Sequence, residues 1–286
     1  MSIERLTMFL RRDEVEKMGN NKRDSLGDRM KENYENRAKT FLIRRTPCII
    51  RLDGKAFHSF TRNLKKPYDQ VFHKAMNSTL MYLCMNIQGC KFGYTQSDEI
   101  SLLLTDYDTL TTDAWFNYNV QKMCSISASM ATFAFNRYFE LYANEVADAI
   151  IVMQDQDVEK EYLTALNKCM LNGGLFDARC FSVPAAEVAN CFIWRQQDAT
   201  RNAIQMLGQM HFSSKELHKK NTDMIQDMLW KVKGINFNDM SIPFKRGICC
   251  YREDNPNGRS SWYLDEACPI FTQDRNYIER HLPRED

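Results

Sequence analysis

RLDGKAFHSFTR at 51–62 and YTQSDEISLLL at 94–104 are the stretches that decide the fold of this chain. The segment PCII at 47–50 directly precedes the first stretch. Residues Pro47 to Asp53 therefore form a short apolar, β-branched run that stops at Gly54. That pattern predicts a buried strand feeding a turn. The second stretch predicts a β-hairpin with strands at 90–95 and 100–105 and the polar tip QSDE at 96–99. One strand therefore ends on an acid, and the neighbouring hairpin carries two acids at its tip.

Helical patterns separate these strands. Pro67 is well placed as the first residue of a helix of about five turns that runs to residue 86. A longer helical pattern covers 113–142, a strand pattern covers 175–183, and a second long helix is predicted from residue 185 to 207. The order β-α-β-β-α-β is that of the ferredoxin-like arrangement, which is also the core of polymerase palms. We therefore predict an α+β fold: a polymerase-palm core with added helices and a small C-terminal extension.

The remaining segments complete the predicted organisation. Residues 1–40 are charged, with apolar positions at helical spacing, which predicts an N-terminal helical arm. Residues 41–145 form the catalytic half of the palm, and 146–286 hold the remainder of the palm, the long helix and the C-terminal region. In this last part, 211–233 carries an amphipathic helical pattern and 247–252 a strand pattern.

Composition excludes several classes of protein. The 286 residues include 38 Lys and Arg against 37 Asp and Glu, a net charge of +1, so nucleic-acid binding would require a local basic patch. Ten scattered cysteines without a C-x-x-C pair predict reduced thiols. With no signal-peptide or membrane-spanning pattern, the expectation is a cytoplasmic protein that does not contact membranes.

The acids at these turns predict a metal site. In a sheet of this order, the end of the strand at Asp53 lies beside the hairpin tip that carries Asp98 and Glu99. Two carboxylates a few ångströms apart share a proton or are neutralised by cations. Hard oxygen ligands suit Mg²⁺, and two such ions about 3.5–4 Å apart promote in-line phosphoryl displacement.

A purely structural interpretation is also open for each acid. An Asp before Gly is most often a turn former, and an acidic hairpin tip is most often a solvated surface. Taken singly, these acids favour the structural interpretation. Their combination at two neighbouring positions of the sheet favours the metal site.

Basic and backbone groups near these acids suggest phosphate and RNA contacts. The backbone amides of residues 55–58 could surround phosphate oxygens, although the P-loop pattern is absent. Lys66 and Lys122 could add positive charge to that cradle. A basic track for RNA is expected from Arg195, Arg201, Lys245 and Arg246, with Trp194 and Trp262 as stacking partners.

Four blocks of sequence resemble the tRNA-His guanylyltransferase family. They are RLDGKAFHSFTR at 51–62, LKKPYD at 64–69, YTQSDEISLLL at 94–104 and WRQQDATRN at 194–202, in family order. With the intervening helices, the resemblance covers roughly residues 25–255 and is strongest to the Thg1-like branch. It implies a palm fold, transfer of nucleotides to the 5′ end of a tRNA in the 3′-to-5′ direction, two Mg²⁺ ions, ATP and GTP or another nucleoside triphosphate as substrates, and a homotetramer.

The resemblance also implies roles for individual residues. Asp53 and Asp98 match the metal-ligand carboxylates, the Gly54 carbonyl matches a backbone ligand, and Glu99 matches the adjacent catalytic acid. The residues that match the nucleotide-binding groups of the family are Lys55, Ala56, Phe57, His58, Lys66, Ser97 and Lys122.

One block departs from the family pattern. Eukaryotic members carry His-Ile-Asn-Asn where this chain has TRNA at 200–203, and only Asn202 is kept. That block is tied to recognition of the histidine anticodon, so the departure favours template-dependent repair of truncated tRNA 5′ ends, with Asn202 among the tRNA contacts. Addition of G at position −1 of tRNA-His, a palm-based nucleotide cyclase and a non-enzymatic RNA-binding module remain the alternatives.

Overall fold

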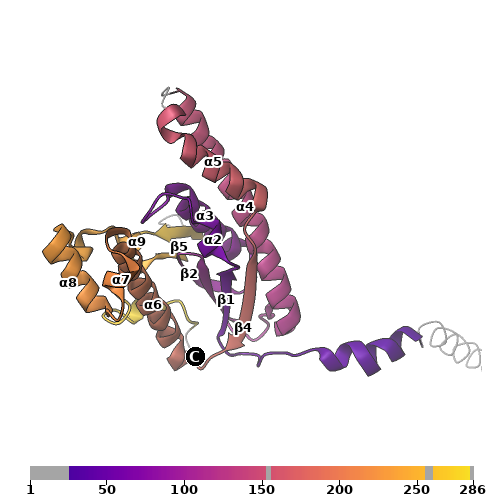
Figure 1. Cartoon of the computed structure of the whole chain (residues 1–286). Coiled ribbons are helices and arrows are strands. Elements are labelled where there is room, and N and C mark those ends of the chain that lie inside the picture. Colours follow the sequence, from indigo (N-terminus) through magenta and orange to yellow (C-terminus); the bar gives the residue numbers. More distant parts are fainter. Residues whose placement is uncertain (1–25, 153–155, 255–259, 284–286) are drawn as a thin grey trace, which may run out of the picture. The chain divides into compact units, whose positions relative to one another are not determined.

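The computed structural model describes residues 26–152, 156–254 and 260–283, which form two units (Figure 1). One unit ends at Phe41 and the other comprises Leu42–Asp286. Residues 1–25 of the predicted N-terminal arm lie outside the described residues. The described part of the arm is helical at 26–30 and continues through η1 (Lys31–Glu35) and η2 (Asn36–Ala38).

The second unit is built on a six-stranded antiparallel sheet. Its strands are β1 (Cys48–Gly54), β2 (Cys90–Gln96), β3 (Glu99–Leu104), β4 (Phe176–Ser182), β5 (Ile248–Asp254) and β6 (Ser260–Asp265). They are arranged β4-β1-β3-β2-β5-β6. The first four strands have the ferredoxin-like order, and the predicted α+β class is confirmed. The sequence did not predict β6, an edge strand whose partly exposed residues lack a clear apolar alternation.

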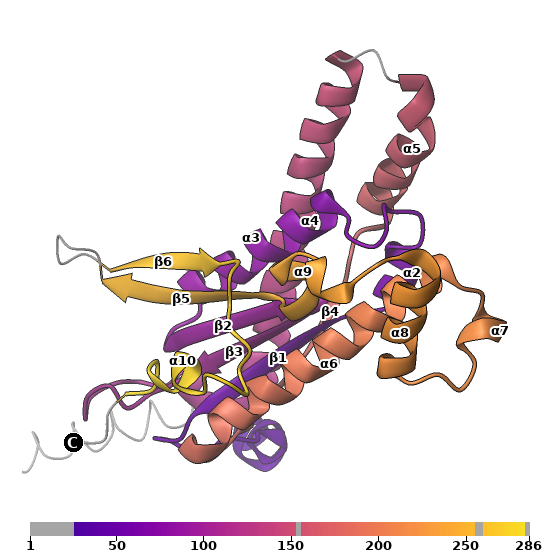
Figure 2. The ribbon, with the colours of Figure 1, turned by 90° about the vertical axis from the view of Figure 1, so that its left-hand side faces the viewer.

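Helices cover both faces of the sheet (Figures 1 and 2). One face packs against α3 (Gln70–Asn86) and α4 (Val120–Val152), and the other against α6 (Ala185–His211). Because side chains alternate along a strand, β1 supplies both cores. Ile50 and Leu52 lie in the cluster under α3 and α4, whereas Ile49 lies in the cluster under α6.

Smaller elements extend this sandwich. They are α2 (Phe57–Phe60), η3 (Trp115–Tyr118), α5 (Gln156–Asn172), α7 (Ser214–Leu217), α8 (Thr222–Lys233), η4 (Phe237–Asp239), α9 (Ile242–Arg246) and α10 (Asn276–Glu279). Figure 2 shows α4 and α5 as a helical pair that rises from the sheet. The predicted division near residue 145 falls within α4. Within the described ranges, no helix combines the length and apolarity needed to cross a membrane.

Three predicted helix boundaries were wrong. Pro67 does not begin a helix: α3 starts at Gln70, because the Asp69 side chain accepts the Phe72 amide and caps the first turn. The helix predicted from residue 113 starts at Val120, after the left-handed residues Phe116 and Asn117. The helix predicted over 211–233 is divided into α7 and α8 around Lys219, which has a φ of 59°.

Packing of α3 on the sheet requires a glycine in β2. A Cβ atom on Gly93 would lie 2.6 Å from the Cys84 sulfur and 2.7 Å from Leu80 Cδ1, both on α3. We therefore expect Gly93→Ala to destabilise the protein by about 1–3 kcal/mol through overpacking, measured by urea denaturation. The comparison variant is Gly234→Ala, where a Cβ atom meets nothing within 4 Å and only the left-handed backbone is strained. A Gly93→Ala protein as stable as the wild type would contradict this packing.

Candidate active site

The register of the sheet gathers acids at one end of β1. Asp53 is paired with Glu99 of β3 on one side and with Asp177 of β4 on the other. Directly opposed residues of antiparallel strands point to the same face, so the three carboxylates lie on the α6 face. Asp177 was missed in the sequence. The strand at 175–183 was predicted, but only the pairing register shows that Asp177 is the neighbour of Asp53.

A two-residue turn brings Asp98 to the same place. Ser97 and Asp98 connect β2 to β3, and Ser97 has a left-handed backbone with a φ of 53°. The Gly54 amide donates to the Asp98 carbonyl at 3.1 Å, which ties the turn to the end of β1. Burial raises the pKa of the Asp98 carboxyl, and the nearby Asp53 charge adds to that rise. Asp98 and Asp53 are thus close enough to repel each other.

The segment after β1 is held by aromatic packing. A Cβ atom on Gly54 would lie 2.5 Å from the Phe57 ring, so glycine permits Phe57 to pack beneath the turn. Ala56 adopts the left-handed conformation at the start of α2. Of the amides predicted to cradle phosphate, that of Lys55 already donates to the Leu175 carbonyl at 2.8 Å. The amides of Ala56, Phe57 and His58 precede the first hydrogen bond of α2, which Ser59 makes to the Ala56 carbonyl.

Glu99 is engaged by an arginine of α6. Arg195 Nε lies 2.6 Å from Glu99 Oε1, and Arg195 Nη2 lies 2.8 Å from Asp198 Oδ2. Burial raises the pKa of the Glu99 carboxyl, and the charge of Arg195 opposes that rise. Arg195 is 9% exposed, so the structure places it inside the site and not along an open RNA track. The exposed ring of Trp194 lies 4.2 Å from the Arg195 guanidinium carbon.

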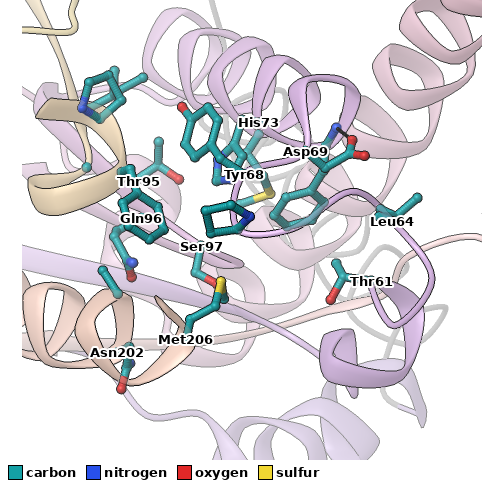
Figure 3. A pocket seen from close by; sticks show the side chains of 18 of the residues that line it. Thr61, Leu64, Tyr68, Asp69, His73, Thr95, Gln96, Ser97, Asn202 and Met206 are labelled. Carbon is teal, nitrogen blue, oxygen red and sulfur yellow. Dashed lines mark hydrogen bonds between the residues drawn. The ribbon is translucent and has the colours of Figure 1, made fainter. Parts of the chain in front are cut away.

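A cleft opens beside Asp98 (Figure 3). Thr95, Gln96 and Ser97 of the hairpin line one part of it. The segment from Thr61 to His73, the α6 residues Asn202 and Met206, and residues of α9 and the start of β5 are among those that line the rest. Its inner part has a cavity volume of about 70 Å³, below the usual range of ligand pockets. An adjoining part of about 600 Å³, partly open to solvent, reaches His58, Lys66 and Asp98, and its size is within that range. Burial lowers the pKa of Lys66.

The wall of the cleft formed by residues 65–73 is rigidly held. Asp69 is buried and accepts the Lys65 amide at 3.0 Å and the Tyr162 hydroxyl at 2.9 Å, in addition to capping α3. The rings of Tyr68 and His73 are stacked, with centroids 3.6 Å apart. This part of the cleft is therefore formed before any ligand enters.

Four predicted residues lie outside this arrangement. Lys122 is ten residues, or about 15 Å along α4, before Thr132, which contacts Phe176, the β4 partner of Gly54. Lys245 is buried and donates to the Asn238 carbonyl. Arg201 pairs with Asp198 at 2.9 Å, and Arg246 lies next to Lys245 in α9. Asn202, by contrast, reaches the cleft.

The donors beside the cleft fit hard divalent cations. Across the part of the chain that the structure describes, no three His, Cys, Asp or Glu side chains converge as a complete metal cage. Mg²⁺ does not require one, because it commonly takes one or two carboxylates together with water and the phosphates of a substrate. Asp53 and Asp98 at the mouth of a cleft have this chemistry.

Comparison with known proteins agrees with the fold and the site. Residues 27–184 match the family model described as tRNAHis guanylyltransferase. The chain belongs to the tRNAHis guanylyltransferase family. A bacterial tRNA(His) guanylyltransferase (Thg1)-like protein solved in complex with ATP is 42% identical and has a TM-score of 0.75, with 90% of this chain and 98% of that chain covered. A bacterial Thg1-like protein in complex with GTP is 40% identical, with a TM-score of 0.71 and coverage of 90% and 99%.

The chain is also similar to the tRNA(His) guanylyltransferase of Debaryomyces hansenii. It is 26% identical over 228 residues, which are 75% of this chain and 77% of the yeast protein. The resemblance predicted from the four sequence blocks is therefore confirmed, including its Thg1-like character. The chain is a nucleotidyltransferase of the Thg1 type, which adds nucleotides to the 5′ end of tRNA.

The stacked pair in the cleft predicts a pH dependence of stability. Burial, aided by the charge of Lys66, lowers the pKa of His73 from 6.5 to about 3. Between pH 6.5 and 3, His73 binds a proton in the unfolded chain but not in the folded chain. The free energy of unfolding therefore falls as the pH drops through this range. The slope from His73 is at most about 1.4 kcal/mol per pH unit. We expect His73→Phe, which keeps the ring, to weaken this loss in denaturation curves at pH 7, 6 and 5. An equal loss of unfolding free energy between pH 7 and 5 in the two proteins would contradict a lowered pKa of His73.

Proposed function

We propose that this protein is a template-dependent 3′-to-5′ nucleotidyltransferase that repairs the 5′ ends of truncated tRNAs. The observation that carries the proposal is the meeting of Asp53 and Asp98, held together by the Gly54 to Asp98 hydrogen bond, beside a cleft of about 600 Å³. Repair is favoured over marking of tRNA-His because TRNA stands at 200–203, where the eukaryotic members carry His-Ile-Asn-Asn.

Asp53, Asp98 and the Gly54 carbonyl would hold two Mg²⁺ ions. When bound, such ions supply positive charge at the attacking and leaving oxygens of a phosphoryl displacement. Glu99 forms an ion pair with Arg195, so we do not assign it as a metal ligand. We propose instead that Glu99 and Arg195 hold the end of β3 in place.

The cleft is the proposed binding site of the nucleoside triphosphate. Bacterial Thg1-like proteins have been solved with ATP and with GTP, and both nucleotides are proposed substrates here. Lys66 and Ser97 line the cleft near Asp98, together with Phe57 and His58. A phosphate group beside Lys66 would favour the charged ammonium that burial disfavours. Arg62 also lines this part of the cleft, and the exposed Lys55 follows Gly54 directly, whereas Lys122 is remote.

Assembly and location are proposed from the family resemblance and from the sequence. We propose a homotetramer that acts on tRNA in the cytoplasm. The ten cysteines are free thiols in the structure, as expected of a reducing compartment.

A second candidate function is addition of G at position −1 of tRNA-His. It is favoured by the matching family model and by the Debaryomyces hansenii relative, both described as tRNA(His) guanylyltransferases.

Loss of either metal-binding carboxylate should abolish nucleotide addition. We expect Asp53→Asn or Asp98→Asn to lower the rate of addition at least a hundredfold, because even residues that only support metal ligands contribute about 10–100-fold. Binding of tRNA, measured by filter retention, should change little. Asp227→Asn on α8 removes the same charge from an exposed ion pair and should leave both measurements unchanged. Full addition activity in either variant would exclude two-metal chemistry at this site. A wild-type protein that binds tRNA without adding a nucleotide would instead favour a non-enzymatic RNA-binding module.

Template dependence separates repair from the competing activities. With a panel of tRNAs that lack their first nucleotide, we expect incorporation of the nucleotide complementary to the templating base, whichever base that is. Labelled triphosphates and gel analysis measure the product. If the protein added only G, and only to tRNA-His, the function would be addition of G at position −1 and not repair. A product formed without RNA would point to a nucleotide cyclase instead.

A further inference from the structure

We propose that a basic groove between residues 55–65 and helix α5 binds the phosphate backbone of the RNA substrate. This inference rests on the proposed function, because it assumes an RNA whose 5′ end reaches Asp53 and Asp98. The groove lies where the lower end of α5 approaches α2, as both views of the fold show (Figures 1 and 2). No residue of α5 was among the RNA-binding residues predicted from the sequence.

Two adjoining cavities of about 430 and 900 Å³, both partly open to solvent, form the groove. They share Arg62 and Asn63 on one wall and Ala165 and Lys168 on the other. The basic and polar residues that line the groove are Lys55, Ser59, Arg62, Asn63, Lys65, Lys160, Thr164, Lys168 and Asn172.

The positive charge of the groove is largely unpaired. Among the described residues, Lys65 has a carboxylate partner, Glu159 at 3.0 Å, whereas Lys55, Arg62, Lys160 and Lys168 form no ion pair. Glu161 is the acid that lines the groove. Because the whole chain has a net charge of only +1, four such cations along one groove are a local concentration of charge. A polyanion matches this surface.

The walls of the groove are fixed before a ligand arrives. The Cys169 thiol contacts the Phe60 carbonyl at 3.2 Å, and the Tyr162 hydroxyl donates to Asp69 at 2.9 Å. These contacts join α5 to the segment that follows β1. Lys160 and Lys168 are eight residues apart on α5, or about 12 Å along its axis. The groove is therefore longer than a single phosphate group.

The position of the groove explains why an RNA strand fits it better than a free nucleotide. Lys55 follows Asp53 and Gly54 directly, so one end of the groove begins at the catalytic carboxylates. Arg62 lines both the groove and the part of the cleft that contains Asp98. A strand that follows the groove would thus present its end to the site, while the incoming nucleotide occupies the adjoining cleft lined by Lys66, Ser97 and Asp98.

The basic residues predicted from the sequence do not offer an equivalent surface. Arg195 and Lys245 are each 9% exposed and are held by partners inside the protein, and Arg201 is paired with Asp198. The groove along α5 instead carries cations that are free to exchange bound counterions for phosphates.

A double variant of α5 tests the groove. Lys160→Gln with Lys168→Gln removes two exposed charges and keeps good helix formers, so folding is preserved. In the full-length protein, binding of a fluorescent 5′-truncated tRNA is measured by anisotropy over a series of salt concentrations. The slope of log K against log salt should become shallower by about 1.4–1.8, and the affinity at physiological salt should fall on the order of tenfold. In the addition assay, KM for tRNA should rise while KM for the nucleotide stays constant.

The matched control is Lys215→Gln with Lys220→Gln, which removes two exposed charges, one in α7 and one shortly after it. It should reproduce the wild-type slope and KM values. The groove is excluded if the α5 variant matches this control, or if its KM rises for the nucleotide and not for tRNA. A wild-type protein that adds no nucleotide to any tRNA would instead overturn the proposed function, so the two failures are distinguishable.

Discussion

The hydrogen bond from the Gly54 amide to the Asp98 carbonyl, continued by the β1–β3 pairing, is the constraint on which the site depends. It closes the end of the sheet at which β1 stops and the hairpin turns. A shift of one residue in this register would turn Asp53 and Glu99 to opposite faces. Burial of β1 on both faces prevents such a shift, because Ile49 and Ile50 would then exchange their two different cores.

That geometry concentrates negative charge, and the surrounding residues compensate for part of it. Asp53, Asp98, Glu99 and Asp177 meet at one edge of the sheet. Arg195 neutralises Glu99 from α6, so the uncompensated pair is the one that faces the cleft. Family membership agrees with this division, since the bacterial Thg1-like relatives are proteins solved with nucleoside triphosphates. The mutual repulsion of Asp53 and Asp98, which contributes to the raised pKa of Asp98, is the same property that would attract cations.

Local sequence patterns predicted the core and missed its periphery for identifiable reasons. β1 to β4, α3 and α6 carry apolar residues at strand or helix spacing, and each was placed within a few residues. The start of α4 was wrong because the left-handed residues Phe116 and Asn117 are neither glycine nor proline and give no breaker signal. Asp69 was not recognised as the cap of α3, since Pro67 offered a stronger start signal two residues earlier. Helix α5, with Lys160 and Lys168, was not assigned at all.

The sequence by itself determined the fold class, the family and the two acidic turns, because these depend on short motifs and on the period of apolar residues. Asp98, Lys66 and Asn202 were identified from such motifs and line the adjoining parts of one cleft, and Asp53 lies next to the Gly54 amide that binds the Asp98 carbonyl. Only the tertiary structure decided which charges are available. Arg195 and Lys245 look like surface cations in a helical pattern, but packing buries both, and the Glu99 partner of Arg195 is 96 residues away in the chain. Asp177 became part of the site through strand register. Burial and pairing are set by contacts between distant segments, and no local pattern encodes them.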